Sequence, residues 1–587
     1  MVGAPEWDLS SFKRQSSPSQ ASRDRGSTCG LRAMRFRLGA MRLNRILASA
    51  LLVLTLIAMI LVFYPRDGER RASDQVLGFA EARVLEGRAE ALNGNATPLV
   101  SDDTDSSSPP MHLPKNDLLG GLLAVEFDKQ SCLSRFQSAI YRKISPHKPS
   151  SYLISRLREY EKLHKHCGPY TQSYNETLAN INSGKAIGSM DCKYIVWIPF
   201  SGLGNRILTL ASAFLYALLT NRVLLVNRGK NMADLFCEPF PEKSWLLPTD
   251  FSLFNQFQSF DQNSPNCHGN MLKNNIINTS TNALPAYLYL HLAHDYDDQD
   301  KLFFCDEEQT VLAKVPWLVL KTENYFVPSV FLMPSFGEEL SKLFPDKETV
   351  FHHLGRYLFH PTNRVWGLIT RYYQAYLVKA DEKIGIQVRV FDVGNDPFPH
   401  VMDRILACTL KEKLVPEVDE KGSIGSPPEN QKLKAVLMTS LSSGYSEKLK
   451  NMYWEYPTVN GDFVGVYQPS HEEYQQTERQ LHNQKAWAEM YLLSMSDVLV
   501  TSSWSTFGYV AQGLGGLKPW ILSKPEKGIA PDPPCRRAMS MEPCFHDPPF
   551  YDCKAKTGID TGALVPYVRH CEDMSRGLKV VSGRNEL

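Results

Sequence analysis

A run of 20 residues without a charged side chain, Ile46–Pro65, constrains this chain more than any other feature of its sequence. At about 1.5 Å of rise per residue, a helix of that length matches the roughly 30 Å hydrocarbon layer of a bilayer. The run has no polar face, which disfavours a buried core helix. It is also longer than the apolar region of a cleaved signal peptide and lacks an Ala-x-Ala exit. It therefore predicts a transmembrane signal anchor.

Charges on the two sides of this run predict its orientation. Residues 1–45 carry nine lysines and arginines against three acidic residues, whereas residues 66–71 carry three against two. The positive-inside rule places the more basic flank in the cytosol. We therefore expect a single-pass type II protein with a cytosolic tail (1–45), an anchor (46–65) and everything beyond on the lumenal side.

The segment after the anchor, residues 66–130, has the composition of a flexible stem. Its stretch SDDTDSSSPP is polar, contains proline and shows no periodicity. The remaining residues suffice for two large domains. Over the whole chain, 43% hydrophobic and 22% charged residues are ordinary globular values, and a net charge of +1 gives no reason to expect nucleic acid as a partner. A mean hydropathy of −0.28 argues against a polytopic membrane protein.

The positions of the cysteines and glycosylation sequons agree with this predicted topology. Of the 12 cysteines only Cys29 precedes the anchor, so we expect the others mostly in disulfides, as is usual in oxidising compartments. The last four are too widely spaced for paired zinc ligands. Because eleven is an odd number, one thiol stays free or pairs between chains. Sequons at Asn175 and Asn278, with a weaker one at Asn95, predict lumenal glycosylation.

Apolar runs alternate with helical patterns in the rest of the chain, which indicates an α/β fold with parallel sheets. Tyr194–Phe200 predicts a strand, a helix follows from Asn205, and Arg222–Val226 predicts the next strand. Arg356–Lys379 has a helical pattern and is a plausible hinge. Further strands are expected at Lys383–Phe391, Ala435–Ser440, Val464–Val466, Asp497–Thr501 and Trp520–Leu522. A helix that runs through Gly513 is expected after the fourth of these strands.

The first candidate binding element is the turn after the first predicted strand, which contains Gly202, Gly204, Asn205 and Arg206. Glycine lets the backbone approach a ligand, and a helix N-terminus favours an anion. The spacing matches neither G-x-G-x-x-G nor a P-loop. The alternative is a tight turn with an asparagine cap.

The second candidate is Arg389, in the sequence Gln387-Val-Arg-Val-Phe391. It stands at the carboxyl end of an apolar strand, where open α/β sheets bind ligands. An arginine emerging there needs an anionic partner, and a guanidinium engages two phosphate oxygens at once. The alternative is an ion pair with Asp392 or Asp396.

The third candidate is a group of five hydroxyls between a strand end and a helix start, from Thr501 to Thr506. Hydroxyls and free backbone N–H groups at a helix N-terminus can hold a phosphate without lysine. Ordinary N-capping is the alternative, although a single serine would suffice for it. The candidate ligand-binding residues here are Ser502, Ser503, Ser505, Thr506, Phe507 and Gly508.

The fourth candidate is a set of acidic residues near turns. Asp295 and Asp297 form a D-x-D pair that would suggest a metal holding a nucleotide diphosphate. We expect solvated loop acids instead, because no apolar strand directly precedes them, and we assign no metal site. Glu323 and Asp573 are further candidates, as is Asp306 after the strand-like Leu-Phe-Phe-Cys sequence.

Three of these motifs together resemble the plant xyloglucan-type (galactoside 2-α-L-) fucosyltransferase family. They are residues 201–208 (SGLGNRIL), 384–389 (IGIQVR) and 500–509 (VTSSWSTFGY), joined to a type II anchor and stem. The resemblance covers roughly residues 130–580. It implies a GT-B-like architecture, in which two Rossmann-like domains face a cleft. The implied ranges are an acceptor-side domain (131–380), a GDP-fucose-binding domain (381–545) and a disulfide-rich C-terminal segment (546–587) that packs back on the first domain.

The resemblance also implies an activity. A Golgi enzyme would transfer L-fucose from GDP-β-L-fucose, with inversion and without a required metal or cofactor. The acceptor would be the 2-hydroxyl of a terminal galactose or arabinose, on a cell-wall polysaccharide such as xyloglucan or on arabinogalactan protein. The other expected partners are the membrane, through one helix, and a second copy of the chain in a homodimer.

Roles for individual residues follow from the same resemblance. Arg389 would neutralise the pyrophosphate as GDP leaves, Gln387 would bind the donor beside it, and the glycines and hydroxyls would surround the diphosphate. An inverting transfer needs the acceptor hydroxyl to lose a proton. Asp573 and Glu323 are the two candidate bases, although the family usually has aspartate at position 323. Proton loss to water is the third possibility.

Two rival functions differ from this one in the sites that they need. A type II glycan-binding protein that kept the fold but lost transfer would not need a diphosphate site. A metal-dependent GT-A transferase would need the Asp295–Asp297 pair placed after a strand. The presence of Arg389 together with the hydroxyl cluster favours the fucosyltransferase.

Overall fold

The computed structural model describes residues 115–124, 126–183, 191–229, 231–278, 280–281, 284–391, 398–422, 430–524 and 531–583. The predicted tail and anchor, and the stem up to residue 114, lie outside these ranges. None of the helices within them is long and apolar enough to cross a membrane.

The first sheet is built from four parallel strands in the order β2-β1-β4-β3. The strands are β1 (Tyr194–Ile198), β2 (Val223–Val226), β3 (Tyr287–Leu292) and β4 (Trp317–Thr322). Helix α6 (Leu203–Leu219) connects β1 to β2 and is buried along most of its length. The predicted strand, turn, helix and strand in this region are confirmed.

The second sheet has six strands in the order β10-β9-β8-β5-β6-β7. All neighbours are parallel except β10, which pairs antiparallel with β9 at the edge. The five strand predictions in this region are confirmed to within a few residues. The strands are β5 (Glu382–Gln387), β6 (Leu433–Thr439), β7 (Phe463–Tyr467), β8 (Val498–Ser502), β9 (Trp520–Leu522) and β10 (Cys535–Arg537).

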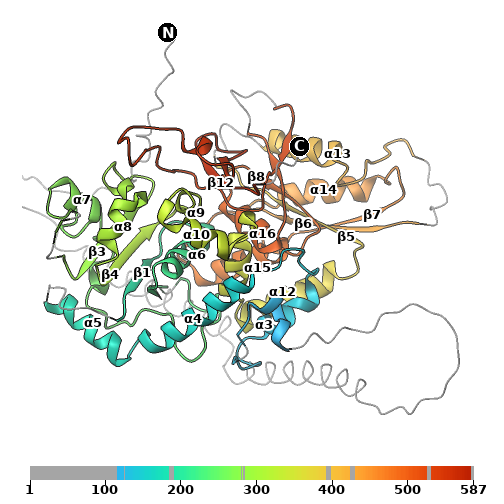
Figure 1. The fold of residues 1–587 in the computed structure, drawn as a ribbon. Coiled ribbons are helices and arrows are strands. Elements are labelled where there is room, and N and C mark those ends of the chain that lie inside the picture. Colours follow the sequence, from blue (N-terminus) through green and yellow to red (C-terminus); the bar gives the residue numbers. More distant parts are fainter. Residues whose placement is uncertain are drawn as a thin grey trace, which may run out of the picture. The chain divides into compact units, whose positions relative to one another are not determined.

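Helices lie between and around the two sheets. Figure 1 shows α6, α15 (Gln480–Leu493) and α16 (Thr506–Gly515) between β1 and β5, and α16 packs against both α6 and α15. Buried residues of both sheets and of these helices form one large apolar core. The other helices of at least nine residues are α3 (Leu133–Tyr141), α4 (Ser151–Cys167), α5 (Gln172–Ser183), α10 (Pro334–Leu343), α13 (Phe398–Lys411) and α14 (Gly444–Glu455), together with α11 and α12, described below.

Shorter elements complete the described chain. A two-stranded antiparallel sheet joins β11 (Val568–His570) to β12 (Leu578–Val580). The short helices are η1 (Lys115–Gly121), η2 (Phe254–Gln256), α7 (His268–Lys273), η3 (Asp300–Phe304), α8 (Asp306–Leu312), α9 (Val327–Val330), η4 (Lys347–Thr349) and η6 (Thr561–Ala563).

The predicted helix over residues 356–379 is wrong as a single element. The structure has α11 (Val350–Leu358), a break that contains Pro361, and then α12 (Asn363–Tyr372), which continues into the π-helical turn η5 (Tyr373–Leu377). Proline lacks an N–H and disfavours helical backbone in the residue before it, which explains the break. Because α11 packs against α6 and α16, and α12 against α15, these helices connect the two halves.

Strands β3 and β4 were missed, and two expectations that depended on this region are wrong. Both strands are short, buried and almost continuously apolar, so periodicity does not distinguish them from helix. Strand β3 ends three residues before Asp295, so an apolar strand does precede the D-x-D pair. The strand-like sequence before Asp306 instead forms the 3-10 helix η3.

Ten of the eleven cysteines after the predicted anchor form disulfides, and Cys267 is buried and free. This confirms the expectation of mostly paired cysteines with one left over. Because their sulfurs are bonded to each other, the paired cysteines cannot ligate zinc. The pairs are Cys132–Cys237, Cys167–Cys192, Cys305–Cys553, Cys408–Cys535 and Cys544–Cys571.

The C-terminal segment contacts both halves of the chain. The Cys305–Cys553 disulfide bonds it to the start of α8, and β12 packs against α9. The Tyr296 hydroxyl donates to the Asp547 carbonyl at 2.5 Å. From the other half, the turn before α16 binds Asp573.

Candidate functional site

A cavity of about 440 Å³ lies where the carboxyl ends of strands from both sheets meet. The turns after β1 and β8, the ends of β5 and β6, the loop after β7, one side of α15 and two residues of the C-terminal segment line it. Eight of the predicted ligand-binding residues are in this lining. They are Gly202, Gly204, Asn205, Gln387, Arg389, Ser505, Thr506 and Phe507.

Two helix N-termini face this cavity, one from each half. Helix α6 starts after Gly202, and α16 starts after Ser505, whose hydroxyl accepts a hydrogen bond from the Gly508 N–H at 3.4 Å. Each turn contains a residue other than glycine with left-handed backbone, Ser201 (φ 61°) and Trp504 (φ 62°). Such backbone is uncommon and concentrates at functional sites. Because helix N-termini carry partial positive charge, the cavity suits an anion.

Gly204 is required by a close approach between these two helices. A Cβ at this position would lie 2.7 Å from Thr506 Oγ1 and 3.0 Å from the Phe507 nitrogen. The neighbouring Asn205 accepts from the Thr506 hydroxyl at 3.0 Å and donates to the Glu323 carbonyl at 3.0 Å. Asn205 therefore ties the two helix starts together, and its side chain does not cap the turn.

Arg389 has no carboxylate partner within the described part of the chain. Its Nη2 donates to Gln475 Oε1 at 2.9 Å, and its backbone N–H donates to Ser502 Oγ at 2.9 Å. Burial lowers the pKa of its guanidinium, with no described anion to offset this effect. The alternative partners Asp392 and Asp396 lie outside the described residues. A bound anion would compensate the desolvated charge.

The five hydroxyls of the Ser/Thr cluster have different roles. Ser505 and Thr506 reach the cavity, whereas the Ser503 hydroxyl donates to the Leu522 carbonyl at 2.6 Å. The Thr501 hydroxyl donates to Gln387 Oε1 at 2.9 Å, and Ser502 binds the Arg389 backbone. Ser502 and Ser503 therefore hold the strand ends in place, and Ser502, Ser503 and Gly508 are not part of the cavity lining.

Arg206 lies beside the cavity without lining it. Its side chain is 6% exposed, and its Nη2 lies 3.4 Å from Glu478 Oε1. Burial lowers the pKa of Arg206. The second oxygen of Glu478 accepts from Asn231 Nδ2 at 2.6 Å, so these residues connect the first half to the loop before α15.

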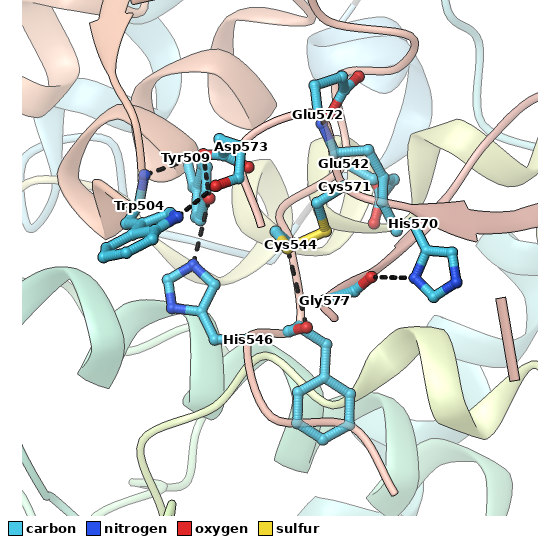
Figure 2. The surroundings of a disulfide bond; sticks show 12 residues. Trp504, Tyr509, Glu542, Cys544, His546, His570, Cys571, Glu572, Asp573 and Gly577 are labelled. Atoms are coloured by element: carbon cyan, nitrogen blue, oxygen red, sulfur yellow. Dashed lines mark hydrogen bonds and ion pairs between the residues drawn. A yellow bond between two sulfur atoms is a disulfide. The ribbon is translucent and has the colours of Figure 1, made fainter. Parts of the chain in front are cut away.

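The first candidate base, Asp573, is an anchor for the turn that starts α16. Its Oδ2 accepts from the Trp504 N–H at 2.9 Å and from the Tyr509 hydroxyl at 2.7 Å. Figure 2 shows this carboxylate between the two aromatic residues, with His546 on the other side of the tyrosine hydroxyl. Asp573 does not line the cavity, but Met574 and His546 do.

The second candidate base, Glu323, follows strand β4 and is held by His294. Its Oε1 accepts from the His294 backbone N–H at 2.6 Å and also contacts the imidazole Nδ1. Burial alone would lower the pKa of His294, but the Glu323 carboxylate outweighs burial and raises it. Glu323 is not among the cavity-lining residues.

The D-x-D pair does not reach the cavity either. Asp295 accepts from His291 at 2.9 Å, and Asp297 accepts from the Gln299 and Asp300 N–H groups at 2.9 Å. Both carboxylates therefore bind within or beside their own loop, and neither is among the cavity-lining residues.

Both sequon asparagines lie on exposed parts of the described chain. Asn175 is in helix α5, and Asn278 precedes β3. The Asn278 Oδ1 accepts from the Ser280 N–H at 2.9 Å. Their exposure is compatible with glycosylation.

Several lining residues were not singled out from the sequence. The buried Glu489 on α15 is one, and its Oε1 accepts from the Ser470 hydroxyl at 2.6 Å. An acidic residue within the apolar sequence WAEMYLL was a signal for it. His482, whose Nδ1 lies 3.1 Å from Glu472, and His546 carry no local signal.

Comparison with known proteins gives concordant results. The sequence model of the xyloglucan fucosyltransferase family matches residues 90–554. The galactoside 2-alpha-L-fucosyltransferase of Pisum sativum is 68% identical over 483 residues, 82% of this chain and 84% of that protein. The Arabidopsis thaliana enzyme of the same name is 59% identical over 98% of this chain and its own full length.

A solved structure extends the similarity to the fold. It is that of an arginine-to-lysine mutant of Arabidopsis thaliana FUT1 in complex with GDP. It superposes with a TM-score of 0.75 at 66% identity, and covers 79% of this chain and all of the other.

Proposed function

Since this chain belongs to the xyloglucan fucosyltransferase family, we infer that it is a galactoside 2-α-L-fucosyltransferase with GDP-L-fucose as donor. The observation that carries the assignment at the site is Arg389, which lines a cavity faced by two helix N-termini and has no described carboxylate partner. A protein that only binds glycans would not need such a site for an anion. The diphosphate of the donor accounts for it.

The reaction breaks the bond between C1 of fucose and the β-phosphate oxygen, and negative charge develops on the departing GDP. We propose that Arg389 and the N-termini of α6 and α16 stabilise this charge, with hydrogen bonds from Ser505 and Thr506. Fixed donors aimed at developing charge usually make the largest contribution to catalysis. The acceptor 2-hydroxyl attacks C1 from the opposite side, which gives inversion.

We also propose the finer architecture that the family implies. Each sheet with its helices corresponds to one Rossmann-like unit of a GT-B-like fold, residues 131–380 on the acceptor side and 381–545 on the donor side. The position of the cavity at strand carboxyl ends supports this division.

Glu489 is the proposed reader of the guanine base. A carboxylate can accept from the two N–H donors on one edge of guanine, and such charge-assisted bonds are the stronger kind. Burial raises the pKa of Glu489 to about 8, so much of this carboxyl group is protonated at neutral pH before the donor binds. Binding of the guanine edge favours the ionised form, and a proton is therefore released.

We expect Glu489→Gln to raise the KM for GDP-fucose about 10- to 100-fold, because a charge-assisted hydrogen bond is lost. Calorimetry in buffers of different ionisation enthalpy should show proton release on GDP binding in the wild type and none in the variant. The control is Glu473→Gln, which changes an exposed glutamate outside the cavity lining. An unchanged KM in Glu489→Gln would refute the guanine assignment.

The activity is tested with the full-length protein in detergent, labelled GDP-fucose and two acceptors. We expect label on galactose-terminated xyloglucan, measured after digestion with a linkage-specific α1,2-fucosidase, and equal rates with and without EDTA. Transfer to arabinogalactan protein alone would change the acceptor assignment. GDP binding without transfer to either acceptor would favour the glycan-binding alternative.

We propose a type II Golgi membrane protein with residues 66–587 in the lumen. The charge difference across residues 46–65, five disulfides and two exposed sequons support this topology. Treatment of the expressed protein with an N-glycosidase should increase its gel mobility, and Asn175→Gln with Asn278→Gln should reduce that change. A wild-type protein whose gel mobility does not change after this treatment would argue against the lumenal location of residues 66–587.

A further inference from the structure

We propose that His546 accepts the proton of the attacking 2-hydroxyl, and that Tyr509 and Asp573 position it for this role. The inference rests on the fucosyltransferase function proposed above and assigns the proton acceptor within it. His546 belongs to the C-terminal segment and lines the cavity together with Trp504 and Met574.

Hydrogen-bond directions define which ring nitrogen carries the proton. The Tyr509 hydroxyl has one hydrogen, and it donates this to the Asp573 carboxylate at 2.7 Å, since an ionised carboxylate only accepts. At the 3.1 Å contact between Tyr509 and His546, the phenol oxygen must therefore accept from Nε2–H. This fixes the tautomer with a lone pair on Nδ1, which has no hydrogen-bond partner among the described residues (Figure 2).

The surroundings keep this imidazole neutral at physiological pH. Burial lowers the pKa of His546, and the nearby carboxylates Asp573 and Asp547 oppose this without reversing it. The group that faces the ring from α16 is Tyr509, whose own pKa is raised well above its usual value by burial and by Asp573. The tyrosine therefore stays protonated and keeps its donor role.

The two carboxylates predicted as bases do not line the cavity. Asp573 Oδ2 already accepts two hydrogen bonds and its Oδ1 is buried without a partner among the described residues, while Glu323 Oε1 is held by His294. The second imidazole of the cavity, His482, has Glu472 at Nδ1 and accepts from the Gln476 N–H at Nε2, at 3.3 Å. His546 is thus the cavity imidazole with a lone pair available.

The proposed step balances in atoms and charge. As the acceptor oxygen forms its bond to C1 of fucose, its proton moves to Nδ1 of His546. The bond between C1 and the β-phosphate oxygen breaks, and GDP leaves with the electron pair. The resulting imidazolium donates through Nε2–H to Tyr509, which remains bonded to the Asp573 carboxylate. The proton then passes to solvent.

His546→Gln tests the proposal through kcat and its pH dependence. We expect kcat to fall about 10²- to 10⁴-fold, the usual contribution of a general base. The KM for GDP-fucose and the Kd for GDP should stay within about twofold, because proton acceptance adds little to ground-state binding.

In the wild type, kcat should fall at acidic pH as the ring protonates, with a midpoint below the ordinary histidine pKa of about 6.5. This acid limb should be absent in the variant. The control is His166→Gln, which changes an exposed histidine on α4.

Variants of the positioning residues provide an independent test. Asp573→Asn removes a negative charge that raises the pKa of His546, so the acid limb should move to lower pH. Tyr509→Phe removes the acceptor for Nε2–H and should lower kcat about tenfold, the effect of misorienting a base. A purely structural role would not move the acid limb.

The outcomes separate the inference from the function on which it rests. If the wild type transfers no fucose to any acceptor, the proposed function fails. Two results would exclude His546 as the proton acceptor when the wild type does transfer fucose. The first is a kcat of His546→Gln within about threefold of the wild type, well short of the loss expected for a general base. The second is an acid limb that persists in this variant. If that variant loses GDP binding through misfolding, an unmoved acid limb in Asp573→Asn overturns the proposal instead.

Discussion

Arg389→Ala should lower kcat/KM for fucose transfer by about 10³-fold or more, the range for removing a cation that stabilises a departing phosphate. The expected loss is mostly in kcat, because charge on the β-phosphate grows as the bond to fucose breaks. No described carboxylate pairs with the Arg389 guanidinium. Its removal therefore leaves no buried acid without a partner. Folding and yield should therefore stay normal.

Initial rates with labelled GDP-fucose measure this effect, and the melting temperature checks the fold. Arg389→Lys keeps a charge but not the fork of two donors, and it should fall between the wild type and the alanine variant. Arg364→Ala, on the exposed side of α12, is the matched control and should behave as wild type. Near-normal turnover in Arg389→Ala would show that the diphosphate binds elsewhere.

Gly204→Ala should lower kcat/KM about 100-fold, because the added methyl group separates the two helix N-termini that face the cavity. The atoms it would meet include the Thr506 carbonyl carbon at 2.9 Å and the Phe507 nitrogen at 3.0 Å. These are backbone atoms, so the contact cannot be relieved by a side-chain rotation. The free energy of unfolding should fall by about 1–3 kcal/mol, as in other overpacked sites.

The control for this variant is another helical glycine. Gly337 lies inside α10, and a Cβ there would meet nothing within 4 Å. Gly337→Ala should raise the free energy of unfolding by about 0.5–1 kcal/mol, since alanine is the better helix former. Urea unfolding and transfer rates measure both variants. Wild-type activity in Gly204→Ala would mean that the close contact with α16 is not needed for donor binding.

The sequence predicted the parts of the site whose chemistry is local. Glycines, hydroxyls and an arginine directly follow apolar strands, and the sheet topology brings these strand ends together. Which hydroxyls reach the cavity could not be predicted in this way, because their directions depend on the left-handed backbone at Trp504. Ser503 and Ser505 flank Trp504 in the sequence. The Ser505 side chain lines the cavity, whereas the Ser503 hydroxyl donates to the Leu522 carbonyl.

The residues that sequence reasoning missed come from distant segments. Glu489 lies on α15, and His546 and Met574 lie in the C-terminal segment, so only the tertiary fold brings them to the cavity. The two predicted bases show the reverse case. Asp573 and Glu323 have the right chemistry, but neither lines the cavity, and one oxygen of each carboxylate accepts from donors of another segment. The role of an acidic residue depends on hydrogen-bond partners from distant segments, which the local sequence does not reveal.

The Cys305–Cys553 disulfide spans 248 residues of sequence and holds the segment that supplies His546 and Met574. Ribosomes make this segment after both sheets, so the cavity is not complete until this segment has been made. A nascent chain can form its two halves and still lack the wall that contains His546. Oxidation of Cys553 then joins this wall to the first half. In biosynthetic terms, assembly of the donor site depends on the oxidising capacity of the compartment in which the chain folds.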